Sequence, residues 1–440
     1  MIKPVKTILC TALILSAALT GCGTEPFKDL PEDTQEYIDE NRAATIDAMF
    51  MNVEIEEPEI DPKINPEFTV YPTGTIAATD FGLKLLKESM KEGENTLISP
   101  LSVLCALGMT ANGAEGDTLE QMEALFGIPR QQMNEYLYAY INALPQSDKY
   151  KLTLANSIWI KEMKGLKIEE DFLQTNADWH NAEIYRAPFD DTTLGQINNW
   201  VNENTDGMIP AILNQIPSDA IMYLINAFVF DAEWQTIYES TQIRDGIFTA
   251  ADGTKQDVEM MYCSEYQYLE DDGAVGFLKY YADKKYAFAA LLPNEGTSLE
   301  EYTASLTAER LSALLANPQE ITVETAIPKF QCEYSVELSD IFQQMGMTDA
   351  FDRDAADFTS MGSCTEGPLC ISKILHKTYI SVDERGTKAG AVTAVEMLRA
   401  TAFVPDEVKT VYLDRPFLYM LIDCEENLPV FIGTLEWMDQ

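Results

Sequence analysis

The segment from Thr387 to Leu398 alternates between two kinds of residue, and this alternation constrains the fold more than any other feature of the chain. The even positions carry both of its charged residues. The odd positions are small or apolar: Thr387, Ala389, Ala391, Thr393, Val395 and Met397. Such a period of two is typical of a strand with one buried face. Gly386 and Gly390 weaken a permanent strand, and residues 399–407 offer no tight hairpin turn. The segment is therefore either an edge strand with a long loop, or a loop that can enter a sheet as a strand.

Helical and strand patterns both occur in the rest of the chain. Apolar runs at 152–160 and 220–230 have the length and composition of buried strands. Residues 197–206 and 336–347 have helical patterns, whereas 417–435 read as two strands around a turn. Helices dominate early and strands dominate late, without an internal repeat. We therefore expect one large domain of the α+β class.

The strong acidity of the chain excludes some partners. Lys and Arg number 30 against 72 Asp and Glu, which gives a formal charge of -42. Nucleic-acid binding needs a basic face, so we expect no nucleic-acid partner. The same charge disfavours electrostatic docking on anionic lipid. A self-repelling, solvated surface that keeps an exported protein soluble is the simplest interpretation.

The N-terminus has the pattern of an export signal. Lys3 and Lys6 precede a short apolar run that is too short to span a bilayer. The tetrad LTGC that ends at Cys22 resembles the bacterial lipobox. By that resemblance Cys22 is lipidated and anchors the protein to the outer face of a bacterial membrane. We expect a signal peptide at 1–21, an acidic tether at 22–75 and a globular domain at 76–440.

No motif for catalysis or metal binding is present. The sequence lacks GxSxG, HExxH, a Walker loop and GxGxxG, and its cysteines have no zinc-site spacing. Of the two histidines, His180 has the polar context of a surface helix or loop, and His376 that of a buried strand. We expect no enzyme, no cofactor and no metal. Export permits a disulfide between Cys364 and Cys370, although the sequence favours free thiols.

Eight motifs, in order along the chain, resemble the serpins, a family of serine protease inhibitors. They are NTLISPLSV (95–103), GAEGDTLEQM (113–122), INNWVNENTDGMI (197–209), LINAFVFDAEW (224–234), IPKF (327–330), VDERGTKAGAVTA (382–394), DRPFLYML (414–421) and PVFIGTL (429–435). The resemblance spans roughly residues 76 to 440. It implies a fold of three β-sheets with about nine helices and an exposed reactive-centre loop.

The resemblance also implies a mechanism and a set of site residues. A target serine protease attacks the loop and forms an acyl-enzyme, and the cut loop then enters the main sheet and distorts the trapped protease. The hinge of the loop comprises Glu384, Gly386, Thr387, Lys388, Ala389, Gly390, Ala391 and Thr393. Ser99, Ser102, Asn198 and His376 form a polar shutter under the sheet, and Trp234 marks the breach where the loop enters. Lys388 stands where the family favours Glu, and Met208 where it favours Lys.

The bond that is cut follows from a count along the loop. In the family it lies about seventeen residues from the hinge glutamate, which gives Ala400-Thr401 here. Ala400 suits elastase-like or subtilisin-like proteases. Cleavage one residue earlier, at Arg399-Ala400, suits trypsin-like enzymes. Met397, Leu398 and Ala402 remain further positions for the residue before the bond.

The partners follow from the same resemblance. We expect a monomer that meets a target serine protease in a covalent complex and a membrane through the lipid on Cys22. Two other classes stay open: a non-inhibitory member of the same fold that binds a ligand, and a lipid-anchored ligand-binding protein of another fold. A stable covalent complex with the protease separates an inhibitor from the first class, which would be cleaved like a substrate. Stabilisation by cleavage separates both serpin classes from the last.

Overall fold

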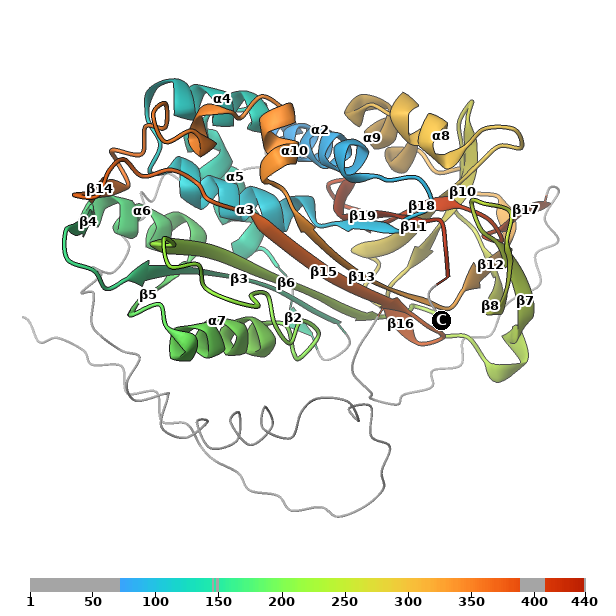
Figure 1. The fold of residues 1–440 in the computed structure, drawn as a ribbon. Coiled ribbons are helices and arrows are strands. Elements are labelled where there is room, and N and C mark those ends of the chain that lie inside the picture. The colour runs from blue at the N-terminus through green and yellow to red at the C-terminus, as the bar shows by residue number, and fades with distance from the viewer. Residues whose placement is uncertain (1–71, 145, 148–149, 388–407, 439–440) are drawn as a thin grey trace, which may run out of the picture. The chain divides into compact units, whose positions relative to one another are not determined.

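The computed structural model describes residues 72–144, 146–147, 150–387 and 408–438. Every described residue belongs to one compact unit, Met51–Gln440. Figure 1 shows the order of its elements. Among the described residues, no helix is long and apolar enough to cross a membrane.

Nine α-helices and two short 3-10 helices lie in the described residues. The α-helices are α2 (Pro72–Ser89), α3 (Pro100–Ala111), α4 (Gly116–Phe126), α5 (Arg130–Asn142), α6 (Glu170–His180), α7 (Asp191–Asn204), α8 (Leu299–Ser305), α9 (Ala308–Ala316) and α10 (Ser339–Gln344). The 3-10 helices are η1 (Ser240–Gln242) and η2 (Asp349–Phe351). The helix expected at 336–347 is shorter, because Val336 and Glu337 complete a strand.

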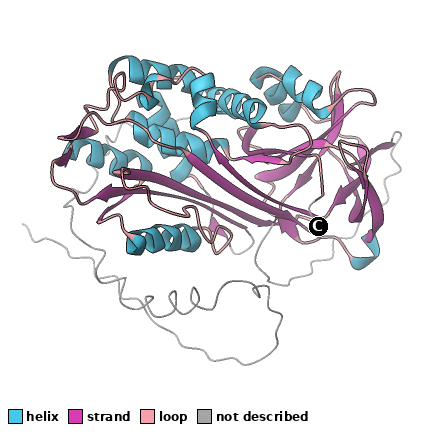
Figure 2. Cartoon of the chain, viewed as in Figure 1, coloured by secondary structure: helices cyan, strands magenta, loops and turns pink. Residues whose placement is uncertain are grey.

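The main sheet has seven strands. Its order is β13 (Phe330–Glu337), β15 (Leu375–Val382), β16 (Gly386–Thr387), β6 (Met222–Glu233), β3 (Tyr150–Lys161) and β2 (Gln146–Ser147), with β5 (Glu183–Ala187) beside β3. The apolar runs that predicted buried strands lie in β3 and β6. Figure 2 shows helices on both sides of this sheet, and α7 is the one described helix on its side.

A six-stranded sheet forms the centre of the core. Its order is β1 (Thr96–Ile98), β19 (Leu428–Leu435), β18 (Phe417–Asp423), β11 (Tyr286–Pro293), β10 (Ala274–Tyr280) and β9 (Tyr268–Glu270). Every residue of β11, β18 and β19 is buried, which explains their continuous apolar sequences. Phe228 of the main sheet stacks on Phe431 of this sheet, with ring centroids 5.1 Å apart. The two sheets therefore share one core.

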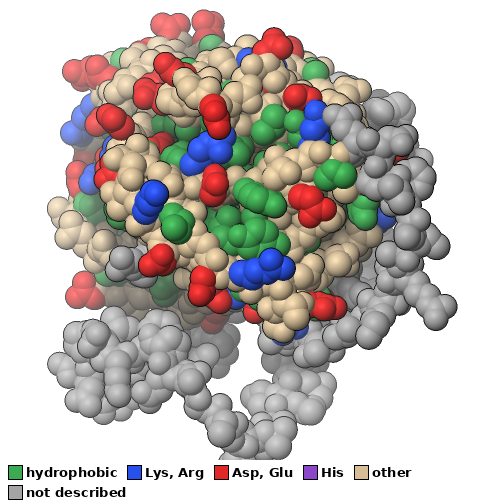
Figure 3. Space-filling view, turned by 90° about the vertical axis from the view of Figure 1, so that its right-hand side faces the viewer, with side chains coloured by type: hydrophobic (Ala, Val, Ile, Leu, Met, Phe, Trp, Pro, Cys, Tyr) green, Lys and Arg blue, Asp and Glu red, His purple; other side chains and the backbone are tan. Residues whose placement is uncertain are grey.

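Two smaller sheets complete the unit. One has the order β17 (Val408–Tyr412), β12 (Thr322–Pro328), β8 (Lys255–Glu265) and β7 (Ile243–Thr249), and the other pairs β14 (Gly362–Cys364) with β4 (Leu166–Ile168). Figure 3 looks onto the side of the molecule that carries the four-stranded sheet, where hydrophobic side chains lie among charged ones. The expected α+β class is confirmed, with the β14–β4 pair in addition to three larger sheets.

Candidate functional site

The segment that opened the sequence analysis begins as a two-residue strand in the middle of the main sheet. Strand β15 ends at Val382, the chain turns through 383–385, and β16 then pairs with both β15 and β6. The Asp383 carboxylate accepts hydrogen bonds from the backbone N–H groups of Arg385 (2.8 Å) and Gly386 (3.2 Å), which stabilise the turn. This turn directs the chain back between two long strands.

Gly386 is required by the close approach of β6. A Cβ at this position would lie 2.0 Å from the carbonyl oxygen of Ala232. To relieve this clash the backbone of β6 would have to move, which would disrupt its hydrogen bonds in the sheet. The glycine that weakened the strand prediction therefore permits the strand to enter. Its neighbour Thr387 is buried, and its hydroxyl forms a hydrogen bond with the Tyr281 hydroxyl.

Trp234 closes over this entry point. Its indole N–H donates to the Asp383 carbonyl (2.8 Å), and its backbone N–H donates to the Arg385 carbonyl (2.8 Å). The buried indole stacks on the Tyr281 ring at 4.6 Å. Because Tyr281 also holds Thr387, one aromatic pair fixes both the turn and the new strand. Tyr281 had no sequence signal of its own.

A buried cation lies beneath the indole. Lys279 is 2% exposed and forms an ion pair with Glu265 at 2.8 Å. Its Nζ lies 4.4 Å from the centre of the Tyr238 ring and 5.3 Å from that of Trp234, within the range of a cation–π interaction. Burial raises the pKa of the neighbouring Cys263 thiol, which contacts both Glu265 and Tyr238. Removing either partner of the ion pair would leave an uncompensated charge under the entry point.

Lys329 lies between β12 and β13 and anchors the hinge through ion pairs. Its Nζ lies 2.9 Å from the carboxylate of Glu384 and 3.2 Å from that of Glu259. The hydrogen bond from Lys329 lowers the pKa of the Glu384 carboxyl. Glu384 was predicted from the sequence but Lys329 was not, although Lys329 lies in the motif IPKF.

We expect Lys329→Gln to loosen the hinge by about 1 kcal/mol or less, because both partners are partly exposed and the ion pair is screened. Limited proteolysis of the loop should accelerate by up to about fivefold, the corresponding change in opening equilibrium. Lys377→Gln is the matched control, since it removes a 2.8 Å pair with Glu333 on the same sheet away from the hinge. Equal acceleration by both variants would contradict a specific role for Lys329.

A polar cluster lies further along the seam between β15 and β6. The backbone N–H of Ser99 donates to His376 Nε2 at 3.2 Å, and the Ser99 hydroxyl donates to the Val430 carbonyl at 3.2 Å. The same hydroxyl accepts from the backbone N–H of Ser102 (3.4 Å) and caps α3. Burial lowers the pKa of His376 to about 4. His376 is thus a neutral acceptor near neutral pH.

The seam itself is open below β16. In the described residues, β15 pairs with β13 along its whole length but with β16 only at Val382. Strand β6 pairs with β3 along its length and with β16 only at Ala232 and Glu233. Residues 375–381 and 222–231 therefore present strand edges that no described strand joins. An unpaired strand edge is a template for one more strand.

The remaining predicted loop residues lie outside the described residues. These are Lys388, Ala389, Gly390, Ala391, Thr393, Met397, Leu398, Arg399, Ala400, Thr401 and Ala402. Cys22 and the segment 1–71 lie outside them as well. In the described residues no group of three or more His, Cys, Asp or Glu could hold a metal ion, and Cys364 and Cys370 are free thiols.

A family model described as Serpin (serine protease inhibitor) matches residues 76–436. The chain belongs to the serpin family. Its relatives include an uncharacterized serpin-like protein of Thermococcus kodakarensis, 29% identical, with 82% of this chain and 84% of the relative covered. Serpin B6 of Macaca fascicularis is 28% identical, with 80% and 96% covered. The described architecture is therefore the serpin fold.

Solved serpin structures match the same fold. The thermophilic serpin tengpin in its native state is 46% identical, with a TM-score of 0.77 over 87% of this chain and 96% of that one. Tengpin in its latent state is 45% identical, with a TM-score of 0.75 over 87% and 100%. Human thyroxine-binding globulin, in complex with its hormone, is 23% identical with a TM-score of 0.74 over 84% and 100%, and this likeness concerns the fold alone.

One residue predicted for the serpin shutter lies elsewhere. The Asn198 side chain accepts from the backbone N–H groups of Ile212 and Leu213, both at 2.9 Å, and donates to the Leu213 carbonyl. It fixes the segment after α7 instead of contacting His376. Asn198 stands in a helix on the outer side of the sheet, which a motif match alone did not reveal.

Asn226 is a further polar residue, on the strand β6 that borders the seam. It lies on the strand face that also carries Phe228, and its Nδ2 donates to Asn156 Oδ1 at 2.8 Å. Its Oδ1 is buried without a partner among the described residues. The sequence carries a signal for this residue, because Asn226 is a polar residue inside an apolar strand, but it was not among the predicted site residues.

His180 was placed on the surface by the sequence, and this was wrong. It is fully buried, with Nε2 3.0 Å from Asn134 Oδ1, and burial lowers its pKa to about 3. Phe172, Asn176 and His180 recur every four residues and form the inner face of α6. That spacing is the signal that could have revealed its burial.

Proposed function

We propose that this serpin inhibits serine proteases as a suicide substrate, by inserting its cleaved loop into the main sheet as a new strand. The observation that carries the proposal is β16, a strand of two residues at the top of a seam that no other described strand joins. The small residues after Thr387 have the alternation that a continuing strand needs. Membership of the family of serine protease inhibitors supports the same activity.

The register at β16 can be extended to test whether the loop fits. Thr387 lies opposite Ala232 of β6 and Val382 of β15, both in antiparallel pairing. Continuing two residues at a time places Ala389 opposite Phe230 and Ile380, and then Ala391 opposite Phe228 and Thr378. These four neighbouring side chains on β6 and β15 face the core, so the residues inserted between them need to be small. Residues 389 and 391 are both alanines.

The next inward position would make a polar contact. If the register of Thr387 continues, Thr393 would lie opposite Asn226 on one side and His376 on the other. Asn226 has a buried acceptor without a partner among the described residues, and a threonine hydroxyl can donate to it. Insertion would then satisfy a group that is costly to leave unpaired. This gain contributes to the driving force for insertion.

The proposed reactive bond is Ala400-Thr401, by the count from Glu384. A small residue before the bond suits elastase-like or subtilisin-like proteases. Arg399-Ala400 is the alternative and suits trypsin-like targets through an acidic pocket. The protease is a partner that becomes part of a covalent complex, so the serpin turns over no substrate.

We propose that the protein acts at the outer face of a bacterial membrane. Support comes from the apolar N-terminal run and the LTGC tetrad that ends at Cys22. An acidic tether up to residue 75 would hold the inhibitory domain, as a monomer, away from the bilayer. Labelling of the wild-type chain but not Cys22→Ser by radioactive palmitate would support the anchor. Recovery of the protein only from the cytosol would exclude it.

The inhibitory function is tested by a gel. The full chain with Cys22→Ser, free of lipid, is mixed separately with elastase, a subtilisin and trypsin and then boiled in SDS. We expect a band at the summed mass with elastase or subtilisin, because the acyl-enzyme ester is trapped. Mass spectrometry of the released C-terminal peptide should find Thr401 as its first residue, or Ala400 if trypsin is the target.

The alternatives predict different gels. A loop that is cut without a stable band identifies a substrate, as expected of a non-inhibitory binding member. A heat ramp on the cut protein then tells whether the loop still inserts, because insertion raises the midpoint of thermal unfolding. If none of the three enzymes cuts the loop or forms a band, the proposed classes of target protease are wrong.

A further inference from the structure

We propose that a pocket at the end of β3 binds a soluble anionic amphiphile, a molecule with a carboxylate head and a straight apolar chain. The pocket has a volume of about 380 Å³ and is lined by Ile160, Lys161, Glu162, Met163, Lys164, Leu166, Ile168 and Arg186. These residues come from the end of β3, the following turn, β4 and β5. The volume lies at the small end of the range for ligand pockets.

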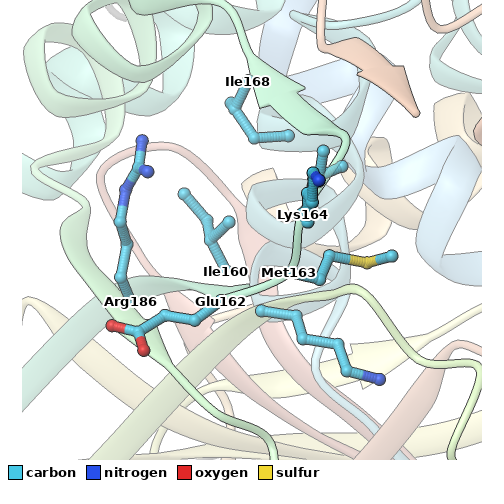
Figure 4. A pocket seen from close by; sticks show the side chains of 8 residues that line it. Ile160, Glu162, Met163, Lys164, Ile168 and Arg186 are labelled. Atoms are coloured by element: carbon cyan, nitrogen blue, oxygen red, sulfur yellow. The ribbon is translucent and has the colours of Figure 1, made fainter. Parts of the chain in front are cut away.

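The floor of the pocket is apolar. Ile160 and Ile168 are buried, and Leu166 and Met163 are half-buried beside them. In Figure 4, Ile160 and Ile168 point into the space between the strands, with Arg186 and Lys164 on opposite sides. Methionine adapts its shape to an apolar guest more readily than a branched side chain does. An unbranched hydrocarbon chain suits this floor.

The rim of the pocket carries uncompensated positive charge. Three cations, Lys161, Lys164 and Arg186, stand against one carboxylate, that of Glu162. The Lys161 Nζ donates to the Ser218 carbonyl at 2.7 Å. Lys164 and Arg186 are exposed and form no ion pair within the described residues. In a chain of formal charge -42, two unpaired cations over one apolar pocket favour a guest with a negative head.

The pocket walls are held in place before any guest arrives. On one side β3 and β5 pair up to Lys161 and Ala187, and Trp159 stacks on Tyr185 at 4.2 Å. On the other, the turn at Gly165 (φ +93°) accepts a hydrogen bond from the Thr365 N–H at 3.0 Å. A preformed pocket spends little binding free energy on ordering its walls. A small carboxylate can therefore bind measurably.

The test is calorimetric titration of the full chain carrying Cys22→Ser with octanoate. We expect sub-millimolar binding that tightens about fourfold for each added methylene until the pocket is full. Octan-1-ol and octylammonium should bind at least about tenfold more weakly, since neither has the anionic head. The readout is binding alone, so its outcome is independent of protease inhibition.

Variants locate the site. Arg186→Gln or Lys164→Gln should weaken octanoate binding about tenfold, and Met163→Trp should abolish it by filling the pocket. Lys255→Gln is the matched control, because Lys255 is also exposed and forms no ion pair within the described residues, and it should change nothing. The proposal is overturned if millimolar octanoate does not bind, if octan-1-ol binds as tightly, or if Arg186→Gln and Met163→Trp both bind normally. Preferential binding of a peptide with a C-terminal leucine would likewise replace the amphiphile by a peptide ligand.

Discussion

Ala391→Arg should convert the protein from an inhibitor into a substrate. In the extended register, residue 391 faces the core between Phe228 and Thr378. A guanidinium buried there without a partner costs several kcal/mol, so insertion should be disfavoured more than about a hundredfold. The protease would complete hydrolysis before the loop inserts. In the SDS gel, the stable band should disappear and the cut serpin should accumulate.

Ala394→Arg is the matched control for this variant. It introduces the same side chain three residues later, at an even position that points away from the core in the proposed strand. The stable band should persist, with a similar rate of initial cleavage. Loss of the band in both variants would show that any arginine in the loop disturbs the protease, and a band in both would rule out insertion in this register.

Acidification should destabilise the native protein through its two histidines. Burial lowers the pKa of His180 to about 3 and of His376 to about 4, against an ordinary value of 6.5. Below about pH 6.5 both histidines are therefore protonated in the unfolded chain but stay neutral in the native state. The free energy of unfolding falls as the pH falls. Each histidine contributes about 1.4 kcal/mol per pH unit, so about 4 kcal/mol is lost by about pH 5.

The measurement is the midpoint of thermal unfolding between about pH 8 and 5 for wild type and His180→Gln. Glutamine can still donate to Asn134 but binds no proton, so the variant should lose about half of the acid sensitivity. The buried carboxyl of Asp423 has a raised pKa because of burial, and its protonation acts in the opposite direction. The comparison between variants removes this common contribution. Identical pH profiles for the two proteins would contradict the assignment to His180.

The fold was largely predictable because its patterns are local and ordered along the chain. Alternation and apolar runs predicted the strands of the main sheet, and the ordered motifs predicted the family. The contacts of the hinge were not predictable in the same way. Lys329 and Tyr281 lie 55 and 106 residues from their partners Glu384 and Thr387. Only the folded sheet brings these side chains together.

Errors arose where a residue type was judged by its immediate neighbours. The polar surroundings of His180 in sequence hid its place on the inner face of α6. Asn198 was assigned to the shutter by motif, whereas its side chain caps the segment after its own helix. In both cases the face of the helix, and not the local composition, decides what the side chain contacts.

The position of β18 and β19 has a consequence for the synthesis of this protein. These two strands are almost the last residues of the chain, yet they lie between β1 and β11 at the centre of the six-stranded sheet. Thr96 near the start of the domain pairs with Thr434 near its end. The sheet therefore cannot close until almost the whole domain has left the ribosome, and such long-range pairing forms slowly. Until β18 and β19 are synthesised, the edges of β1 and β11 that they join stay unpaired, and such strand edges favour aggregation.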